Sequence, residues 1–115
     1  MELQGQSKLL RIFVGESDRI GHQTLYEAIL ITAREKGLAG GTVLKGIMSY
    51  GASSHIHLAR LIELSEDLPI IIEIVDHAEK IDSFLPTVNE LFEKCGKGGL
   101  ITVEKVDVLY YKPKK

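Results

Sequence analysis

Hydrophobic residues recur along this chain at two spacings, every second position in some segments and every third or fourth in others. The alternation predicts β-strands, and the wider spacing predicts amphipathic helices. In chain order we expect a strand, a helix and a strand, then a long connection, and then a strand, a helix and a strand again. The expected strands are residues 8–14, 42–48, 70–75 and 99–110, the expected helices lie within 23–36 and 77–95, and the connection is 49–67.

Local signals mark where several of these elements begin and end. Gly37 is a natural C-terminal stop for the first helix. Asp76 followed by Glu79 is a capping-box pattern, which predicts that the aspartate accepts a free N–H of the second helix. Pro86 lies inside that helix and predicts a bend or a break there. Within the connection, residues 57–64 have the apolar spacing of a short helix.

The order of the elements predicts an α+β fold. Two right-handed β-α-β units laid side by side form a ferredoxin-like split β-α-β fold, with a four-stranded antiparallel sheet and both helices on one face. The chain has 115 residues, a usual size for a single domain, so we expect residues 1–115 to form one domain.

The sheet face away from the helices should be polar if the protein were a monomer. Instead, strand 8–14, after Lys8 at its start, carries apolar residues on both faces, and so does strand 70–75. Only Arg11 and Glu73 interrupt them. These two opposite charges predict an ion pair across the sheet. An exposed apolar face of this size is usually an interface, and burying about 800 Å² per partner suffices for a stable contact. We therefore expect a homo-oligomer.

Composition and charge narrow the class of protein. With 44% hydrophobic residues, the chain can bury a core without a disulfide or a structural metal. A formal net charge of -2 argues against nucleic acid or an anionic membrane as a partner. The single cysteine, Cys95, excludes an internal disulfide, and the sequence contains neither a signal peptide pattern nor a membrane-spanning run. We expect a cytoplasmic protein without membrane insertion.

Residues 94–103, KCGKGGLITV, contain the first candidate site. Glycines let consecutive backbone N–H groups converge on an anion, and Lys97 adds a positive charge, so Gly98 and Gly99 suit a phosphate cradle. The same residues equally suit an ordinary turn from a helix into a strand. The sequence alone leaves both interpretations open.

A second glycine-rich stretch, Gly40, Gly41 and Thr42, leads into the second strand. It suits either a simple turn or a close approach of the backbone to a ligand, with the threonine hydroxyl as a donor. Near the other end of the chain, Tyr110 and Tyr111 suit stacking on a nucleotide base or packing against a neighbouring subunit.

The connection contains a third group of candidate residues. His55 and His57 lie two positions apart, next to Ser53 and Ser54. Two histidines are too few for a structural zinc site, so contact with a ligand or a partner is favoured over metal binding. His55 as the general base of a small enzyme is a further alternative. Because the sequence contains no catalytic triad, paired acid-base carboxylates or Cys/His metal signature, we expect no enzymatic activity.

Several short motifs resemble those of the PII nitrogen-signalling proteins. Residues 37–43, GLAGGTV, resemble the PII stretch Gly-Ile-x-Gly-Met-Thr-Val, and residues 96–99 stand where PII proteins have their glycine-rich B-loop. The chain is most similar to the small bacterial PII-like proteins of the domain-of-unknown-function 190 family. They share Gly-Thr-Val at the second strand, a histidine-rich connection, and the run Leu-Ser-x-Asp-Leu-Pro, here residues 64–69.

The resemblance implies a homotrimer that binds an adenine nucleotide, ADP or ATP, between subunits. The implied nucleotide-binding residues are Gly40, Gly41, Thr42, Lys97, Gly98 and Gly99. It also implies that the connection, like the PII T-loop, relays the bound state to a regulated partner protein. The residues expected on this responsive loop are Tyr50, Gly51, Ser53, His55 and His57. A trimeric divalent-metal-binding protein, similar to the cation-tolerance proteins, is the alternative.

The chain departs from the PII pattern at two places. Leu100 replaces the lysine that PII proteins have just before the last strand, and their B-loop is longer. The Arg-x-Arg pair that follows the last PII strand is also absent, because residues 109–112 read LYYK. Both departures remove positive charge from the region that would contact phosphates.

Overall fold

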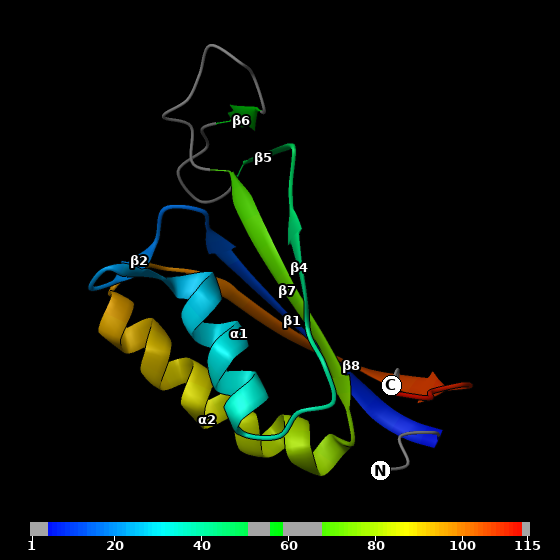
Figure 1. The fold of residues 1–115 in the computed structure, drawn as a ribbon. Coiled ribbons are helices and arrows are strands. Elements are labelled where there is room, and N and C mark those ends of the chain that lie inside the picture. The colour runs from blue at the N-terminus through cyan, green and yellow to red at the C-terminus, as the bar shows by residue number, and fades with distance from the viewer. Residues whose placement is uncertain (1–4, 51–55, 59–67, 114–115) are drawn as a thin grey trace.

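The structure, a computed structural model, describes residues 5–50, 56–58 and 68–113. Two helices cover one face of a four-stranded antiparallel sheet, as Figure 1 shows. The sheet order is β4-β7-β1-β8, with β1 at Gly5–Gly15, β4 at Thr42–Lys45, β7 at Pro69–Asp76 and β8 at Leu100–Val108. The helices are α1, Leu25–Glu35, and α2, Ala78–Cys95. This arrangement confirms the predicted α+β ferredoxin-like fold.

Two short hairpins complete the structure. Strands β2, Arg19–Ile20, and β3, Gln23–Thr24, pair just before α1. Strands β5, Met48–Tyr50, and β6, Ile56–Leu58, pair beyond the end of the main sheet. The predicted strand 42–48 is therefore two strands.

The helix predicted over residues 57–64 is wrong where the structure describes it. His57 and Leu58 belong to β6 and pair with Ser49 and Met48 of β5, while residues 59–64 lie outside the described residues. A few apolar residues at helical spacing are a weak signal, and pairing with a neighbouring strand overrides it.

The core lies between the helices and the sheet, where the expected alternation holds. Leu10 and Ile12 of β1 and Ile72 of β7 have no exposed surface, and their neighbours at odd positions are only partly buried. Complete burial of each such side chain contributes about 1.5–3 kcal/mol to folding. The residues that α1 and α2 add to this core are Leu25, Ile29, Ala33, Ile81, Phe84 and Val88.

The ends of the helices differ in how well the sequence predicted them. The stop at Gly37 is confirmed, because its φ of 79° is a left-handed conformation that glycine adopts without strain. The capping box at Asp76 and Glu79 is wrong. Asp76 is the last residue of β7, the N-cap of α2 is His77, and Asp76 is completely buried.

The Asp76 carboxylate instead joins two segments that are distant in sequence. Its Oδ1 accepts the N–H of His77 at 2.7 Å, and its Oδ2 accepts the N–H of Ala39 at 2.9 Å. The predicted strand ends at residue 75, but β7 continues to Asp76. The alternation of β7 therefore points the Asp76 side chain to the buried face, toward the segment after α1. Asp76 thereby holds residues 39–41 against the end of β7.

Helix α2 runs through Pro86 as one uninterrupted element, so the predicted break does not occur. Pro86 and Asp82, four residues earlier, are both exposed. Water can therefore solvate the carbonyl that the missing proline N–H would have bonded. Within the described residues, no helix is both long and apolar enough to cross a membrane.

We expect Pro86→Ala to stabilise the protein. The substitution restores a helical N–H, and proline costs about 3 kcal/mol relative to alanine in a helix interior. The more flexible unfolded chain offsets about 1 kcal/mol of that gain. Urea unfolding should show a higher free energy of unfolding by about 1–2 kcal/mol, and no gain would mean that the helix is already relaxed around the proline.

Candidate functional site

The sheet face opposite the helices is the first candidate surface, and we call it the helix-free face. Strand alternation and the observed register place these residues on it: Leu9, Arg11, Phe13, Thr42, Leu44, Ile71, Glu73, Val75, Leu100, Thr102 and Glu104. Six of these eleven residues are apolar, and Leu44 and Leu100 among them are 43% and 54% exposed. The expected apolar residues of β1 and β7 do lie on this face, together with five polar or charged residues from all four strands.

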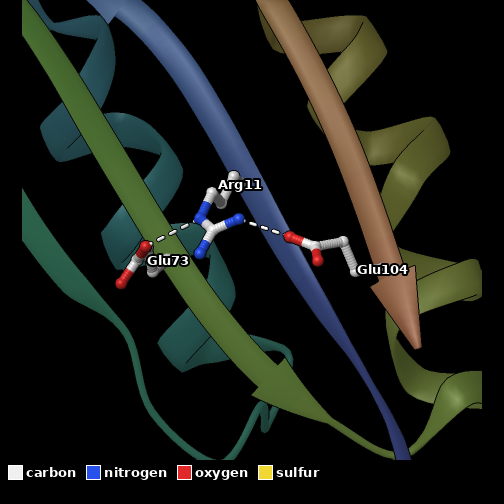
Figure 2. A network of polar contacts seen from close by, with 3 residues as sticks. All are labelled: Arg11, Glu73 and Glu104. Atoms are coloured by element: carbon white, nitrogen blue, oxygen red, sulfur yellow. Dashed lines mark hydrogen bonds and ion pairs between the residues drawn. The ribbon is translucent and has the colours of Figure 1, made fainter. Parts of the chain in front are cut away.

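A network of charges crosses the middle of the helix-free face. Arg11 donates from Nε to Glu73 Oε2 at 2.8 Å and from Nη1 to Glu104 Oε1 (Figure 2). The bond to Glu73 raises the pKa of Arg11 above its ordinary value, so the guanidinium keeps its charge. The pairing of Arg11 with Glu73 is confirmed, and Glu104 was missed. Only the register of β1 with β8 places Glu104 two residues beyond Thr102, the partner of Arg11, and the sequence does not reveal that register.

A pocket of about 390 Å³ opens at the β4 side of this face, and we call it the tyrosine pocket. Its lining residues are Leu9, Ala39, Gly40, Gly41, Thr42, Glu73, Val75, Val108, Tyr110 and Tyr111. The predicted residues Gly40, Gly41 and Thr42 thus lie together with the C-terminal tyrosines. Tyr110 and Tyr111 follow the end of β8, and they border the same pocket as Thr42 at the start of β4.

Residues 39–41 form a wall between the tyrosine pocket and a second hollow. That hollow has a volume of about 350 Å³ and lies against α1, where it also contacts Leu30 and Arg34. A Cβ atom on Gly41 would lie 2.7 Å from Leu30 Cδ1, so this glycine allows the wall to pack against α1. No described atom lies within 4 Å of the Cβ position at Gly40. The wall is therefore tightly packed at Gly41 and open at Gly40.

Residues 96–99, which we call the glycine turn, connect α2 to β8. Gly96 has a φ of 78° and ends the helix, and its N–H donates to the Phe92 carbonyl at 2.9 Å. A Cβ on Gly99 would lie 2.8 Å from the Phe13 carbonyl oxygen, which leaves no room for a side chain. At Gly98 no described atom is within 4 Å of that position, and Lys97 is exposed. The turn interpretation explains Gly96 and Gly99 but not Gly98.

The two groups of predicted nucleotide-binding residues do not meet within one chain. Residues 40–42 enter β4, and the glycine turn enters β8, and these are the two outer strands of the sheet. Three inter-strand spacings of about 4.8 Å, or roughly 14 Å, separate them. Along the strands the offset is smaller: Thr42 pairs with Glu73, which pairs with Arg11, and Leu100 pairs with Phe13, two residues further along β1.

The predicted responsive loop is only partly described. Tyr50 and His57 belong to β5 and β6, while Gly51, Ser53 and His55 lie outside the described residues. Among residues 5–50, 56–58 and 68–113, no group of three His, Cys, Asp or Glu side chains is arranged to hold a metal ion.

Comparison with known proteins identifies the family. The DUF190 family model, described as "Uncharacterized ACR, COG1993", matches residues 7–108. The chain belongs to this DUF190 family. A UPF0166 protein of Aquifex aeolicus is 39% identical over 105 residues, covering 91% of this chain and 95% of its own. UPF0166 protein MJ1524 of Methanocaldococcus jannaschii is 35% identical, covering 85% of this chain and 87% of its own.

Solved structures show that this DUF190 chain has a PII-like fold. CPII of Thiomonas intermedia, a nitrogen regulatory PII-like protein solved with ADP, AMP and bicarbonate, superposes with a TM-score of 0.66. It is 18% identical, over 90% of this chain and 88% of CPII. A PII-like signalling protein of Thermus thermophilus gives a TM-score of 0.65 at 18% identity, over 94% and 93% of the two chains. The predicted family and fold are confirmed.

We expect Gly99→Ala to destabilise the DUF190 protein and Gly98→Ala to leave it unchanged. The alanine methyl at 99 meets a backbone carbonyl and the Phe92 ring, whereas the same methyl at 98 enters open space. Overpacking of this kind costs about 1–3 kcal/mol. Chemical denaturation of both variants checks the difference, and equal stability would contradict the close packing at Gly99.

We expect Asp76→Ala to lower the free energy of unfolding by about 1–3 kcal/mol. Asp76 is completely buried, and the substitution leaves the partly buried N–H groups of Ala39 and His77 without their acceptor. Asp82→Ala is the matched control, because it removes only an exposed ion pair with Lys8. Urea unfolding of the two variants compares them, and similar losses would argue against the role assigned to Asp76.

Proposed function

We propose that this DUF190 protein is a trimeric PII-like regulatory module that binds an adenine nucleotide between subunits. One wall of each site is residues 40–42 with the tyrosine pocket. The other wall is the glycine turn of a neighbouring copy, with Lys97 beside the phosphates. Binding is relayed through the connection at residues 49–67 to a partner protein.

The position of the two glycine-rich segments is the observation that carries this proposal. They lie on opposite outer strands, roughly 14 Å apart across the sheet. In the proposed ring, the β4 edge of each chain would lie against the β8 edge of the next, which would join both segments in one compact site. The exposed apolar residues of the helix-free face supply the surface for such an assembly.

The structural neighbours support the choice of ligand. CPII was solved with ADP and AMP, and it has the same fold over nine-tenths of this chain. The glycine turn adds a charge suited to phosphate, because Lys97 is exposed next to the open position at Gly98. The hairpin of β5 and β6 extends beyond the main sheet (Figure 1), a suitable place for contact with another protein.

We expect the protein to sediment as three chains and to bind ADP with a measurable heat in calorimetry. Lys97→Ala should weaken ADP binding about 10- to 100-fold, since it removes one charge-assisted contact with phosphate. Lys94→Ala is the matched control, because it removes the same charge three residues earlier, on the exposed last turn of α2.

Three outcomes would contradict the proposal. A sedimenting species of one chain would remove the neighbour that the site requires. Equal ADP affinity in Lys97→Ala, Lys94→Ala and the unmodified protein would mean that the glycine turn is only a turn. Heat on titration with zinc or copper, and none with any nucleotide, would favour the metal-binding alternative.

A further inference from the structure

The hollow between α1 and residues 39–41 takes no part in the proposed nucleotide site. It has a volume of about 350 Å³, and we call it the helix-side hollow. Side chains of α1 line it, so it lies on the side of the sheet that the helices cover (Figure 1). The proposed trimer uses the other face, so assembly does not require this side. The volume is at the lower end of the range for small-molecule sites, which suits a small ligand.

The lining of the helix-side hollow is mostly aliphatic. Leu30 and Ala33 contribute from α1, and Leu38 contributes from the segment that follows it. Ile31 also lines the hollow and is 45% exposed, an unusual amount for a large apolar side chain on a helix that packs on a core. An apolar group in the hollow would remove this surface from water, which is favourable.

The backbone at the end of α1 does not favour a cation in the hollow. The Ala33 carbonyl accepts the N–H of Leu38 at 3.1 Å. The Arg34 carbonyl accepts the N–H of Gly37 at the same distance. Such bonds satisfy carbonyls that would otherwise attract positive charge at the end of a helix. On the opposite wall, the N–H of Ala39 is already bonded to the buried carboxylate at the end of β7.

Arg34 is the one charged residue among the described residues that line the hollow. Its side chain is exposed, and it forms no ion pair or hydrogen bond with any described residue. A guanidinium group presents parallel N–H donors that match the two oxygens of a carboxylate. The hollow therefore combines an unpaired positive charge with apolar surface.

We infer that the helix-side hollow binds a small organic carboxylate with an apolar body. Arg34 binds the carboxylate, and Ile31 packs against the body. An inorganic anion would leave the apolar lining in water, and a neutral hydrocarbon would leave Arg34 without a counterion, so neither uses both features. The inference goes beyond the proposed function, because this site needs neither a nucleotide nor a neighbouring copy.

The test is a titration of the full chain with hexanoate, followed by the backbone amide signals in NMR spectra. The signals of residues 30–41 should shift and reach saturation. Two further probes separate the charge from the apolar body: 1-hexanol has the same chain without the charge, and acetate has the charge with almost no chain. Each should bind about tenfold more weakly than hexanoate, or weaker still.

Two variants assign the roles of the side chains. Arg34→Ala should weaken hexanoate about 10- to 100-fold, because it removes a charge-assisted contact. Its matched control is Arg19→Ala, an exposed arginine outside the hollow that donates to the His22 carbonyl. Ile31→Ala should weaken hexanoate about 3- to 10-fold through lost apolar contact.

Ile47→Ala is the matched control for Ile31→Ala, since Ile47 is 75% exposed and lies outside the hollow. Both controls should bind hexanoate like the unmodified protein. All four side chains are exposed, so the variants should keep the fold, and their spectra without hexanoate check this.

The outcomes separate this inference from the proposed function. Absence of a saturating shift at residues 30–41 would overturn the inference. Equal affinity for hexanoate and 1-hexanol, or unchanged hexanoate affinity in Arg34→Ala, would overturn it as well. A protein that binds hexanoate as expected but neither forms trimers nor binds ADP would contradict only the proposed function.

Discussion

The two helices cover only one face of a sheet that carries apolar residues on both faces, and the rest of the structure depends on this constraint. Helices α1 and α2 cover one face, where Leu10, Ile12 and Ile72 are completely buried. The helix-free face has no such cover within the described chain, and it still carries aliphatic residues such as Leu44 and Leu100. Because apolar surface in water is unfavourable, a second covering layer lowers the free energy of the protein. In the proposed trimer, other copies of the chain supply that layer and bring the two glycine-rich segments of different copies together.

The charges on the helix-free face limit how such a layer can be arranged. Arg11 lies between Glu73 and Glu104 and bonds to both, so its charge is satisfied before any partner arrives. A partner that displaced either carboxylate would leave that carboxylate or Arg11 without its counterion in an interface that excludes water. Such a buried, unpaired charge is strongly unfavourable. Packing arrangements of a second copy that leave the ion pairs of Arg11 in place are therefore favoured over arrangements that break them. The network thus links the middle of the face to the tyrosine pocket through a single residue, Glu73.

Sequence patterns predicted the features that depend on near neighbours in the chain. Alternation identified the buried residues of β1 and β7, and Gly37 marked the end of α1 because its signal is local. Asp76 was misread because its partner, the N–H of Ala39, is 37 residues away and known only from the packed structure. Glu104 was missed because its contact with Arg11 depends on the register between β1 and β8. The separation of residues 40–42 from the glycine turn follows from strand order, which periodicity does not determine.

The glycines themselves distinguish what the fold requires from what a ligand or a neighbour requires. Gly96 ends a helix in a left-handed conformation, and Gly41 and Gly99 pack against side-chain or backbone atoms, so the fold of one chain explains all three. Gly40 and Gly98 have neither feature: their backbones are not left-handed, and no described atom is near the position of a Cβ. A glycine in such a place carries an entropic cost without a benefit inside the chain. Both lie in the segments that the proposed site joins, one on each outer strand. The proposed approach of a ligand or a second copy to the bare backbone would account for both glycines, which neither a left-handed turn nor close packing in the described residues requires.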